Sequence, residues 1–378
     1  MPSSRWLAAG VLLAAIADHA AAQAVHLVGP GQLPTIQAAV DLAAPGDVVL
    51  VDAGVYPTFR VGKPLTITAV PSALVQIATK GAVTFTLLPG DRVHLGGLDV
   101  EAAGVTIGGG IVSMERCTLR LQRGLRLVQA MAAMRWCAVG AASSSAVQVQ
   151  DAHLHASDST FYTLAGSAAP NEHAAVKLAG LCTCQLSLCT LFGTWPANTP
   201  WPSVPLHAAG ASAANERIWV VDCTLIGGFD ASSNVGPCIV APPLPAPPPV
   251  RLHRCTTVGA LLGSIATGPV VGLTTPVDMQ IGATFTTTMV GEPGHVLLLY
   301  AGSNILGPFP IPQAEQPALG FLDTVILGAV VANGNGRADF PFAVPHSVAL
   351  RHQVLWWRGL DMSTTPWQAT PAFVSLVQ

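Results

Sequence analysis

Apolar and polar residues alternate along much of this chain in a pattern that repeats. A short phrase ending in Cys-Thr marks the repeats, as at Arg116-Cys117-Thr118 and Asp222-Cys223-Thr224. The marked position, which we call the Cys column, contains Leu98, Cys117, Cys137, Ser159, Cys189, Cys223 and Cys255. Its members are separated by 19, 20 and 22 residues in the first repeats and by up to 34 in the later ones. A period near 20 that grows only by insertion predicts a coil with three short strands in each turn.

The positions around the Cys column support this alignment. Five residues before it, three before it and two after it, the side chains are apolar or small in every repeat except at Thr257. The positions between them hold Arg, Glu, His, Ser and Asp. This alternation is typical of strands that bury one face. Because one turn leaves its inner side chains half covered, the turns must stack, which predicts an all-β fold, a parallel β-helix.

Residues 34–42 form the one segment with a helical pattern. Apolar side chains at positions 36, 39, 40 and 43 precede the chain breaker Pro45-Gly46. The spacing predicts a short amphipathic helix. We expect this helix to cover the N-terminal end of the coil, where a strand edge would otherwise be unpaired.

The same N-terminal region resembles a known family. Residues 35–41 (TIQAAVD), 45–51 (PGDVVLV) and 54–56 (GVY) are similar to the start of proteins of the pectin-lyase-like β-helix superfamily, and residues 63–67 (KPLTI) continue the likeness. The resemblance covers residues 24–265 and implies a right-handed parallel β-helix. It implies no particular activity, because this fold hosts lyases, hydrolases, esterases and non-catalytic surface proteins.

After about residue 270 the Cys phrase stops and a different strand pattern begins. Strands are predicted at residues 279–290, 295–301, 328–331, 338–344, 353–357 and 372–377. Asn333-Gly334-Asn335-Gly336 predicts a hairpin turn, because these residues accept positive φ. We therefore expect a small β-sandwich over residues 273–378, after a coil over residues 23–268. Residues 334–341 resemble part of a C-terminal β module of many exported bacterial proteins, which implies attachment, carbohydrate binding or a cap over the last turn.

Residues 1–22 have the features of a secretory signal peptide. Arg5 precedes an apolar stretch from Trp6 to Ile16, and Ala20-Ala21-Ala22 offers a cleavage site. We expect a secreted or cell-surface protein with no membrane span in the mature chain. Only 10% of residues are charged and the formal net charge is −3. The sequence shows no basic stripe, which argues against nucleic acid as a partner.

The chain has eight cysteines, which in an exported protein suggest disulfides. Those of the Cys column are expected to be buried thiols instead, because stacked side chains that point the same way fit the disulfide torsion poorly. Cys182 and Cys238 lie outside the column and are candidates for one pair. Cys182-x-Cys184 with His153 and His155 lacks the spacing of a zinc site, so neither a metal nor a cofactor is predicted.

Outward positions beside the Cys column gather most of the charges of the coil. The candidate ligand-binding residues are Arg135, His155, Asp158, Trp219, Asp222, His253 and Arg254, together with Trp195 and Trp201 on a long insertion. Arginine binds sugar carboxylates and tryptophan stacks on a sugar ring, which suits an acidic or neutral polysaccharide. The sequence favours a simpler interpretation, a solvated ladder of ion pairs worth under about 1 kcal/mol each.

No catalytic motif is recognisable. The phrase at residues 54–56 lacks the acidic residue that follows it in pectin methylesterases, and Gly294-His295 lacks the next glycine of polygalacturonases. No acidic cluster suggests the calcium site of a pectate lyase, and no carboxylate pair stands out for acid–base chemistry. The sequence favours a non-catalytic protein that binds polysaccharide or belongs to the cell envelope. Two alternatives stay open, a lyase or hydrolase acting on acidic glycans and a purely structural scaffold.

Overall fold

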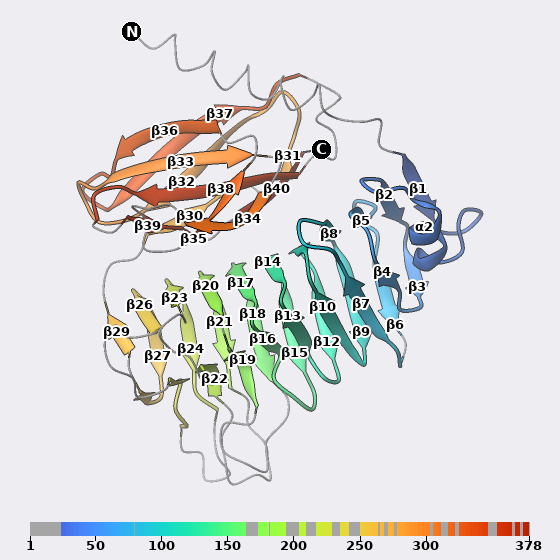
Figure 1. Ribbon diagram of the computed structural model, residues 1–378, viewed down its shortest axis with the longest axis horizontal. Coiled ribbons are helices and arrows are strands. Elements are labelled where there is room, and N and C mark those ends of the chain that lie inside the picture. The colour runs from blue at the N-terminus through green and yellow to red at the C-terminus, as the bar shows by residue number, and fades with distance from the viewer. Residues whose placement is uncertain are drawn as a thin grey trace. The chain divides into compact units, whose positions relative to one another are not determined.

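The computed structural model describes most of residues 24–377, in two units that Figure 1 shows. Residues that it does not describe are 1–23, 79, 164–172, 181, 194–203, 209–216, 229–234, 242–249, 264, 268–270, 276–277, 303–304, 311–316, 322–324, 347–353, 365–366, 371–372 and 378. The predicted signal peptide and the candidate residues Trp195 and Trp201 lie outside the described residues. One unit comprises Ala24–Gly268 and the other comprises Pro269–Gln378.

The first unit is a coil of three parallel sheets, which we call sheets A, B and C (Figure 1). Sheet A contains β1 (Val25–Val28), β2 (Val48–Val51), β5 (Leu65–Ala69), β8 (Arg92–Gly96), β11 (Ile111–Glu115), β14 (Met131–Arg135), β17 (His153–Ser157), β20 (Thr183–Ser187), β23 (Arg217–Val221), β26 (Val250–His253) and β29 (Ile265–Thr267). Sheet B contains β3 (Gly54–Tyr56), β6 (Val75–Ala78), β9 (Leu98–Ala102), β12 (Thr118–Leu121), β15 (Ala138–Ala141), β18 (Thr160–Thr163), β21 (Thr190–Phe192), β24 (Thr224–Ile226) and β27 (Thr256–Val258). Sheet C contains β4 (Arg60–Val61), β7 (Ala82–Thr86), β10 (Gly104–Gly108), β13 (Leu125–Val128), β16 (Val147–Gln150), β19 (Ala174–Ala179), β22 (Val204–Ala208), β25 (Ile239–Val240) and β28 (Leu261–Leu262). The predicted parallel β-helix is therefore confirmed.

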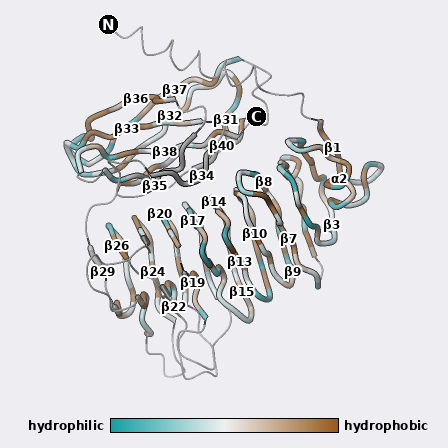
Figure 2. Tube along the Cα trace, in the orientation of Figure 1, coloured by the Kyte–Doolittle hydropathy of each residue, from teal (hydrophilic) through white to brown (hydrophobic). Residues whose placement is uncertain are grey.

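Equivalent side chains of successive turns lie above one another in the core. Val112 pairs with Ala132 and Ala132 with Leu154, and all three are fully buried. Figure 2 shows apolar and polar residues interleaved along the strands of the coil, as this packing requires. Thr257, the exception in the sequence pattern, is exposed on β27, the edge strand of sheet B.

The predicted helix is present as α2 (Ile36–Leu42). The side chain of Thr35 caps it by accepting a hydrogen bond from the amide of Ala38 at 3.1 Å. Ile36, Ala39 and Val40 are buried in the same core as the strands. The helix therefore covers apolar side chains of the first turns, as the spacing predicts.

From Gly97 onward, a single residue in the left-handed conformation forms the corner between sheets A and B in each turn. Its φ is between 47° and 53° at Arg116, Trp136, Asp158, Leu188, Asp222 and Arg254. Arg116, Trp136, Leu188 and Arg254 do not favour this conformation, which costs roughly 1–2 kcal/mol at a residue with a Cβ, whereas aspartate adopts it more readily. In the first turn of the pattern Gly97 takes the position, with φ of 67°. This strained corner recurs from turn to turn, and the free energy gained when the turns stack must offset its cost.

The Cys column follows this corner, and its side chains do more than fill space. The Cys223 thiol accepts a hydrogen bond from the amide of Cys189 at 3.3 Å and donates one to the carbonyl of Val221 at 3.1 Å. Ser159 makes the equivalent pair of bonds, from the amide of Cys137 and to the carbonyl of Ser157. All eight cysteines are free thiols, so Cys182 and Cys238 are not paired. The column therefore satisfies buried backbone groups at the corner, which the sequence interpretation of simple apolar packing missed.

Replacing Cys223 with alanine should lower the free energy of unfolding by about 1–2 kcal/mol, because the buried amide of Cys189 loses its acceptor. Urea unfolding followed by circular dichroism would measure the change. Cys223→Ser is the matched control, and it should cost less because Ser159 makes the same bonds elsewhere in the column. A serine variant no more stable than the alanine variant would show that the sulfur contributes packing alone.

The second unit is a β-sandwich, as predicted. One sheet contains β30 (Gly272–Thr274), β32 (Thr284–Val290) and β37 (Arg337–Ala343). The other contains β31 (Asp278–Met279), β33 (Val296–Gly302), β36 (Val325–Val331), β38 (Val354–Asp361), β39 (Gln368–Ala369) and β40 (Phe373–Val377), and β34 (Ile305–Pro310) pairs with β35 (Pro317–Phe321). Met289, Phe340 and Phe342 of the first sheet share a core with Leu297 and Trp357 of the second.

The turn at Asn333–Gly336 differs from the predicted hairpin. Gly336 has φ of 72° and its amide donates to the carbonyl of Asn333. However, β36 pairs with β33 and β37 pairs with β32, so the turn joins strands of different sheets. In the described part of the chain, no helix is both long and apolar enough to cross a membrane.

Candidate functional site

The predicted ligand-binding residues of sheet A are at outward positions but are not exposed. Arg135, His155 and Trp219 have relative exposures of 4%, 5% and 4%. His155 and Trp219 flank Gln185, which is also buried, in register on neighbouring strands. The expectation that these three face solvent is therefore wrong, because alternation fixes the face of a strand but not how much of that face is covered.

Arg135, at the end of β14, and Asp158, in the corner that follows β17, form a separate group. The Nε of Arg135 is 3.7 Å from a carboxylate oxygen of Asp158. Burial raises the pKa of the Asp158 carboxyl, and the charge of Arg135 offsets part of that shift. The guanidinium of Arg135 also lies 5.1 Å from the ring centre of Trp136. The structure thus joins two of the predicted residues to an aromatic side chain that was not among them.

Trp136 is the exposed aromatic residue of the corner, with a relative exposure of 42%. Arg116, in the same corner position one turn earlier, has its guanidinium 5.3 Å from the ring centre. Both distances are within the range of cation–π attraction, which contributes about 0.5–1 kcal/mol at exposed sites. The Trp136 ring therefore already has cation–π contacts with two arginines of the coil.

Asp222 and Arg254 form the predicted pair between neighbouring turns. The Nε and Nη2 of Arg254 donate to the two carboxylate oxygens of Asp222 at 2.8 and 2.6 Å. Both side chains are partly exposed, so the pair fits the simpler interpretation of a solvated ladder. His253 is half-buried at the end of β26. These three residues are separate from the group around Trp136.

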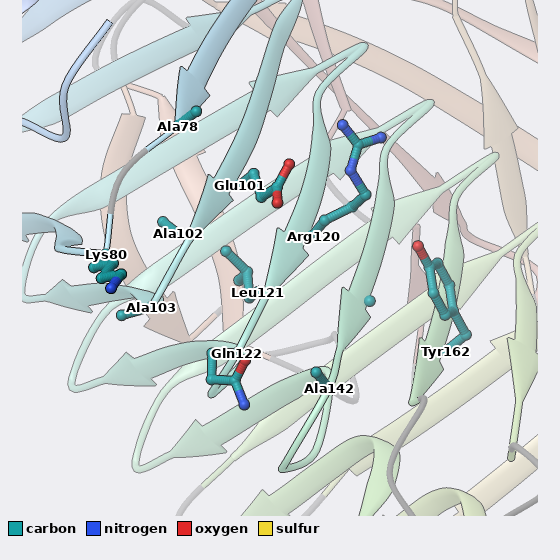
Figure 3. Close-up of a pocket in the computed structure, with 11 residues that line it drawn as sticks. Ala78, Lys80, Glu101, Ala102, Ala103, Arg120, Leu121, Gln122, Ala142 and Tyr162 are labelled. Atoms are coloured by element: carbon teal, nitrogen blue, oxygen red, sulfur yellow. The ribbon is translucent and has the colours of Figure 1, made fainter.

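A hollow of about 630 Å³ lies on the outer side of sheet B (Figure 3). Its lining comes from successive strands β6, β9, β12, β15 and β18 and from the turns that follow them. The lining residues are Ala78, Lys80, Glu101, Ala102, Ala103, Arg120, Leu121, Gln122, Gly140, Ala142 and Tyr162. Many of them are small, which is why the surface is concave there. We call this feature the Tyr162 hollow.

Tyr162 lies over Gly140 on the neighbouring strand. The two residues are in register, and a Cβ placed on Gly140 would be 2.3 Å from the tyrosine ring. The ring therefore occupies the space that any other residue at position 140 would fill. On the next strand, Arg120 donates to the carboxylate of Asp99 at 2.7 Å, which fixes its guanidinium beside the hollow.

Sheet C presents a column of basic and hydroxyl-bearing residues on its outer side. Register places in one line Arg60, Thr84, Thr106, Arg126, Gln148, Lys177 and His207, which we call the basic column. The column includes no Asp or Glu. Beside it is a second hollow of about 520 Å³, lined in part by Arg123, Arg126 and Ser144. The sequence interpretation missed this column because its members are tens of residues apart along the chain.

The described residues include no group of three or more His, Cys, Asp or Glu side chains arranged to hold a metal ion. A scan of protein-family models, a search of curated proteins and a search of solved structures each found no match to this chain.

Proposed function

We propose that this protein is an exported, pectin-lyase-like β-helix that binds an acidic polysaccharide on the outer face of sheet C without altering it chemically. The basic column is the observation that supports this most. Strands in a sheet are about 4.8 Å apart, so the column offers a polar side chain at each turn of the coil, and Arg60, Arg126 and Lys177 add positive charge. The signal-peptide features of residues 1–22 and the family resemblance of residues 24–265 support export and the superfamily.

Charge and hydrogen-bonding capacity favour an acidic glycan over a neutral one at this face. Arg126 and Lys177 flank Gln148, and no carboxylate in the column competes for a ligand. The second hollow adds the guanidinium of Arg123, which suits a carboxylate. The hydroxyls of Ser143 and Ser144 donate to the carbonyls of Gln122 and Ser145, and they can accept hydrogen bonds from the neighbouring sugar hydroxyl groups. A polymer lying along the coil would meet these groups in succession.

Replacing both Arg126 and Lys177 with alanine should weaken binding to polygalacturonate or alginate about tenfold. Two partly exposed charge contacts contribute on the order of 1–2 kcal/mol together. Affinity should be measured by titration at two salt concentrations, because such binding weakens as salt screens it. Arg337→Ala, which removes one exposed positive charge from the other unit, is the control and should bind like the wild type.

The same assay separates the alternatives. Unchanged affinity of the double variant, or equal affinity of the wild type for duplex DNA, would contradict the proposal. Release of an unsaturated product from the polyuronate would identify a lyase. No retention of any glycan on an array would favour the structural scaffold.

A further inference from the structure

We propose that the Tyr162 hollow is a second binding site, for a neutral sugar ring that stacks on Tyr162. It is on sheet B, whereas the basic column is on sheet C, and it differs from that column in charge. The inference goes beyond the proposed function, because it assigns a different ligand class to a different face.

The position of the tyrosine ring is the first argument. Gly140 has no side chain, and the Cε2 and Cζ atoms of Tyr162 would be 2.3 Å from a Cβ there. One face of the ring is therefore held against the backbone of β15, and the ring borders the hollow (Figure 3). An aromatic face fixed in this way is suited to the apolar C–H face of a pyranose, since little side-chain freedom is lost on binding.

The polar groups around the ring are the second argument. Arg120 is in register with Gly140 on one side and with Glu101 on the other. Because Arg120 is bonded to Asp99, the exposed carboxylate of Glu101 is available as an acceptor on the floor of the hollow. Gln122 and Lys80 add donors at its edge. These groups match the mixed donors and acceptors of sugar hydroxyls.

The balance of charge selects a neutral ligand. Lys80 and Arg120 are positive, while Glu101 and Asp99 are negative, so the formal charges of these four residues cancel. A polyanion would meet Glu101 as well as the two bases, unlike at the basic column. The hollow therefore favours an uncharged sugar with both donors and acceptors.

If Tyr162 had a purely structural role, substitutions at this position would have different effects on stability and on sugar binding. An aromatic side chain commonly covers a glycine on the neighbouring strand and protects it from water. In that case the ring would matter for stability and not for any ligand. The alternatives differ in what happens when the ring is moved rather than removed.

Gly140→Ala moves the ring, because the added methyl would overlap it. Binding should be measured by saturation-transfer NMR and calorimetric titration with the hexasaccharides of cellulose, laminarin and mannan. We expect at least one of them to bind the wild type, and both Gly140→Ala and Tyr162→Ala to weaken that binding tenfold or more. Tyr162→Phe should stay within about threefold of the wild type, since it keeps the ring.

Two controls make the outcome specific. Gly62→Ala adds a methyl whose nearest neighbour is 3.7 Å away, so it should not change binding. The Arg126→Ala, Lys177→Ala double variant should keep neutral-sugar binding, which separates failure here from failure of the proposed function. No binding of any of the three hexasaccharides, or wild-type affinity in folded Tyr162→Ala, would overturn the inference. If Gly140→Ala does not fold, the comparison of Tyr162→Ala with Tyr162→Phe decides.

Discussion

Replacing Gly124 with alanine is expected to lower the free energy of unfolding by about 3 kcal/mol or more. Gly124 forms the corner between β12 and β13 with φ of 76°, which disfavours any residue with a Cβ. The new methyl would also be 2.1 Å from the carbonyl oxygen of Ser145 and 2.9 Å from that of Ala146. Both contacts are with backbone, which cannot move without disturbing the next turn, so strain and overpacking add. Urea unfolding measures the loss.

Gly46→Ala separates these two costs. Gly46 also has positive φ, at 92°, but a Cβ there would have no neighbour within 4 Å. It should therefore lose only about 1–2 kcal/mol, the conformational part. If both variants lose the same free energy of unfolding, the carbonyl of Ser145 can move away from the new methyl at no cost. That result would contradict a rigid stack of turns at this corner.

The inner columns of the coil were predictable because their pattern survives insertion. A buried position must be apolar or small in every turn, so Leu119, Val139 and Phe161 keep their place relative to the Cys column even where the turns lengthen. The helix was predictable for a similar reason, since Ile36, Ala39 and Val40 lie on one face. Burial constrains the residue type, and such constraints are visible in a single sequence.

The left-handed corner was not predictable from its residues. Arg116, Trp136 and Leu188 share no preference for positive φ, so stacking of the turns imposes the conformation on them. Gly97 was the strongest local signal, and Asp158 and Asp222 were weaker ones. Likewise, Asn333–Gly336 showed a turn but not its partners, because pairing in the sandwich is decided between strands that are distant in sequence.

The outward sites depend on register and coverage, which the sequence did not provide. The basic column exists only because parallel pairing brings Arg126 and Lys177 into line with Gln148 between them. The Tyr162 hollow exists only because Tyr162 and Gly140 are register partners. Conversely, the residue type and outward position of Trp219 predict a ring on which a sugar could stack, yet Trp219 is buried. Candidate binding residues on a repetitive fold therefore need the register before they can be chosen.

The stability of the protein should fall as the pH is lowered from about 6.5 to about 4, and His94 should account for much of the loss. His94 on β8 is 4% exposed, and its Nδ1 is 2.9 Å from the hydroxyl of Ser113. Burial lowers the pKa of its imidazole to about 4, whereas the unfolded chain keeps a value near 6.5. Between these values the unfolded state binds a proton that the folded state does not, so lowering the pH favours unfolding. The shift corresponds to a loss of about 3 kcal/mol, complete near pH 4.

His94→Gln tests this assignment, because an amide does not titrate and can still bond to Ser113. The free energy of unfolding should be measured from pH 7.5 to pH 4 for both proteins, and the variant should lose about 3 kcal/mol less over that range. Burial also lowers the pKa of His153, whose Nδ1 is 2.7 Å from the hydroxyl of Thr183. That contribution is present in both proteins and cancels in the difference, so parallel pH profiles would exclude His94 as the source. If the wild type and His94→Gln have the same free energy of unfolding above pH 6.5, the neutral imidazole stabilises the folded protein no more than the amide does.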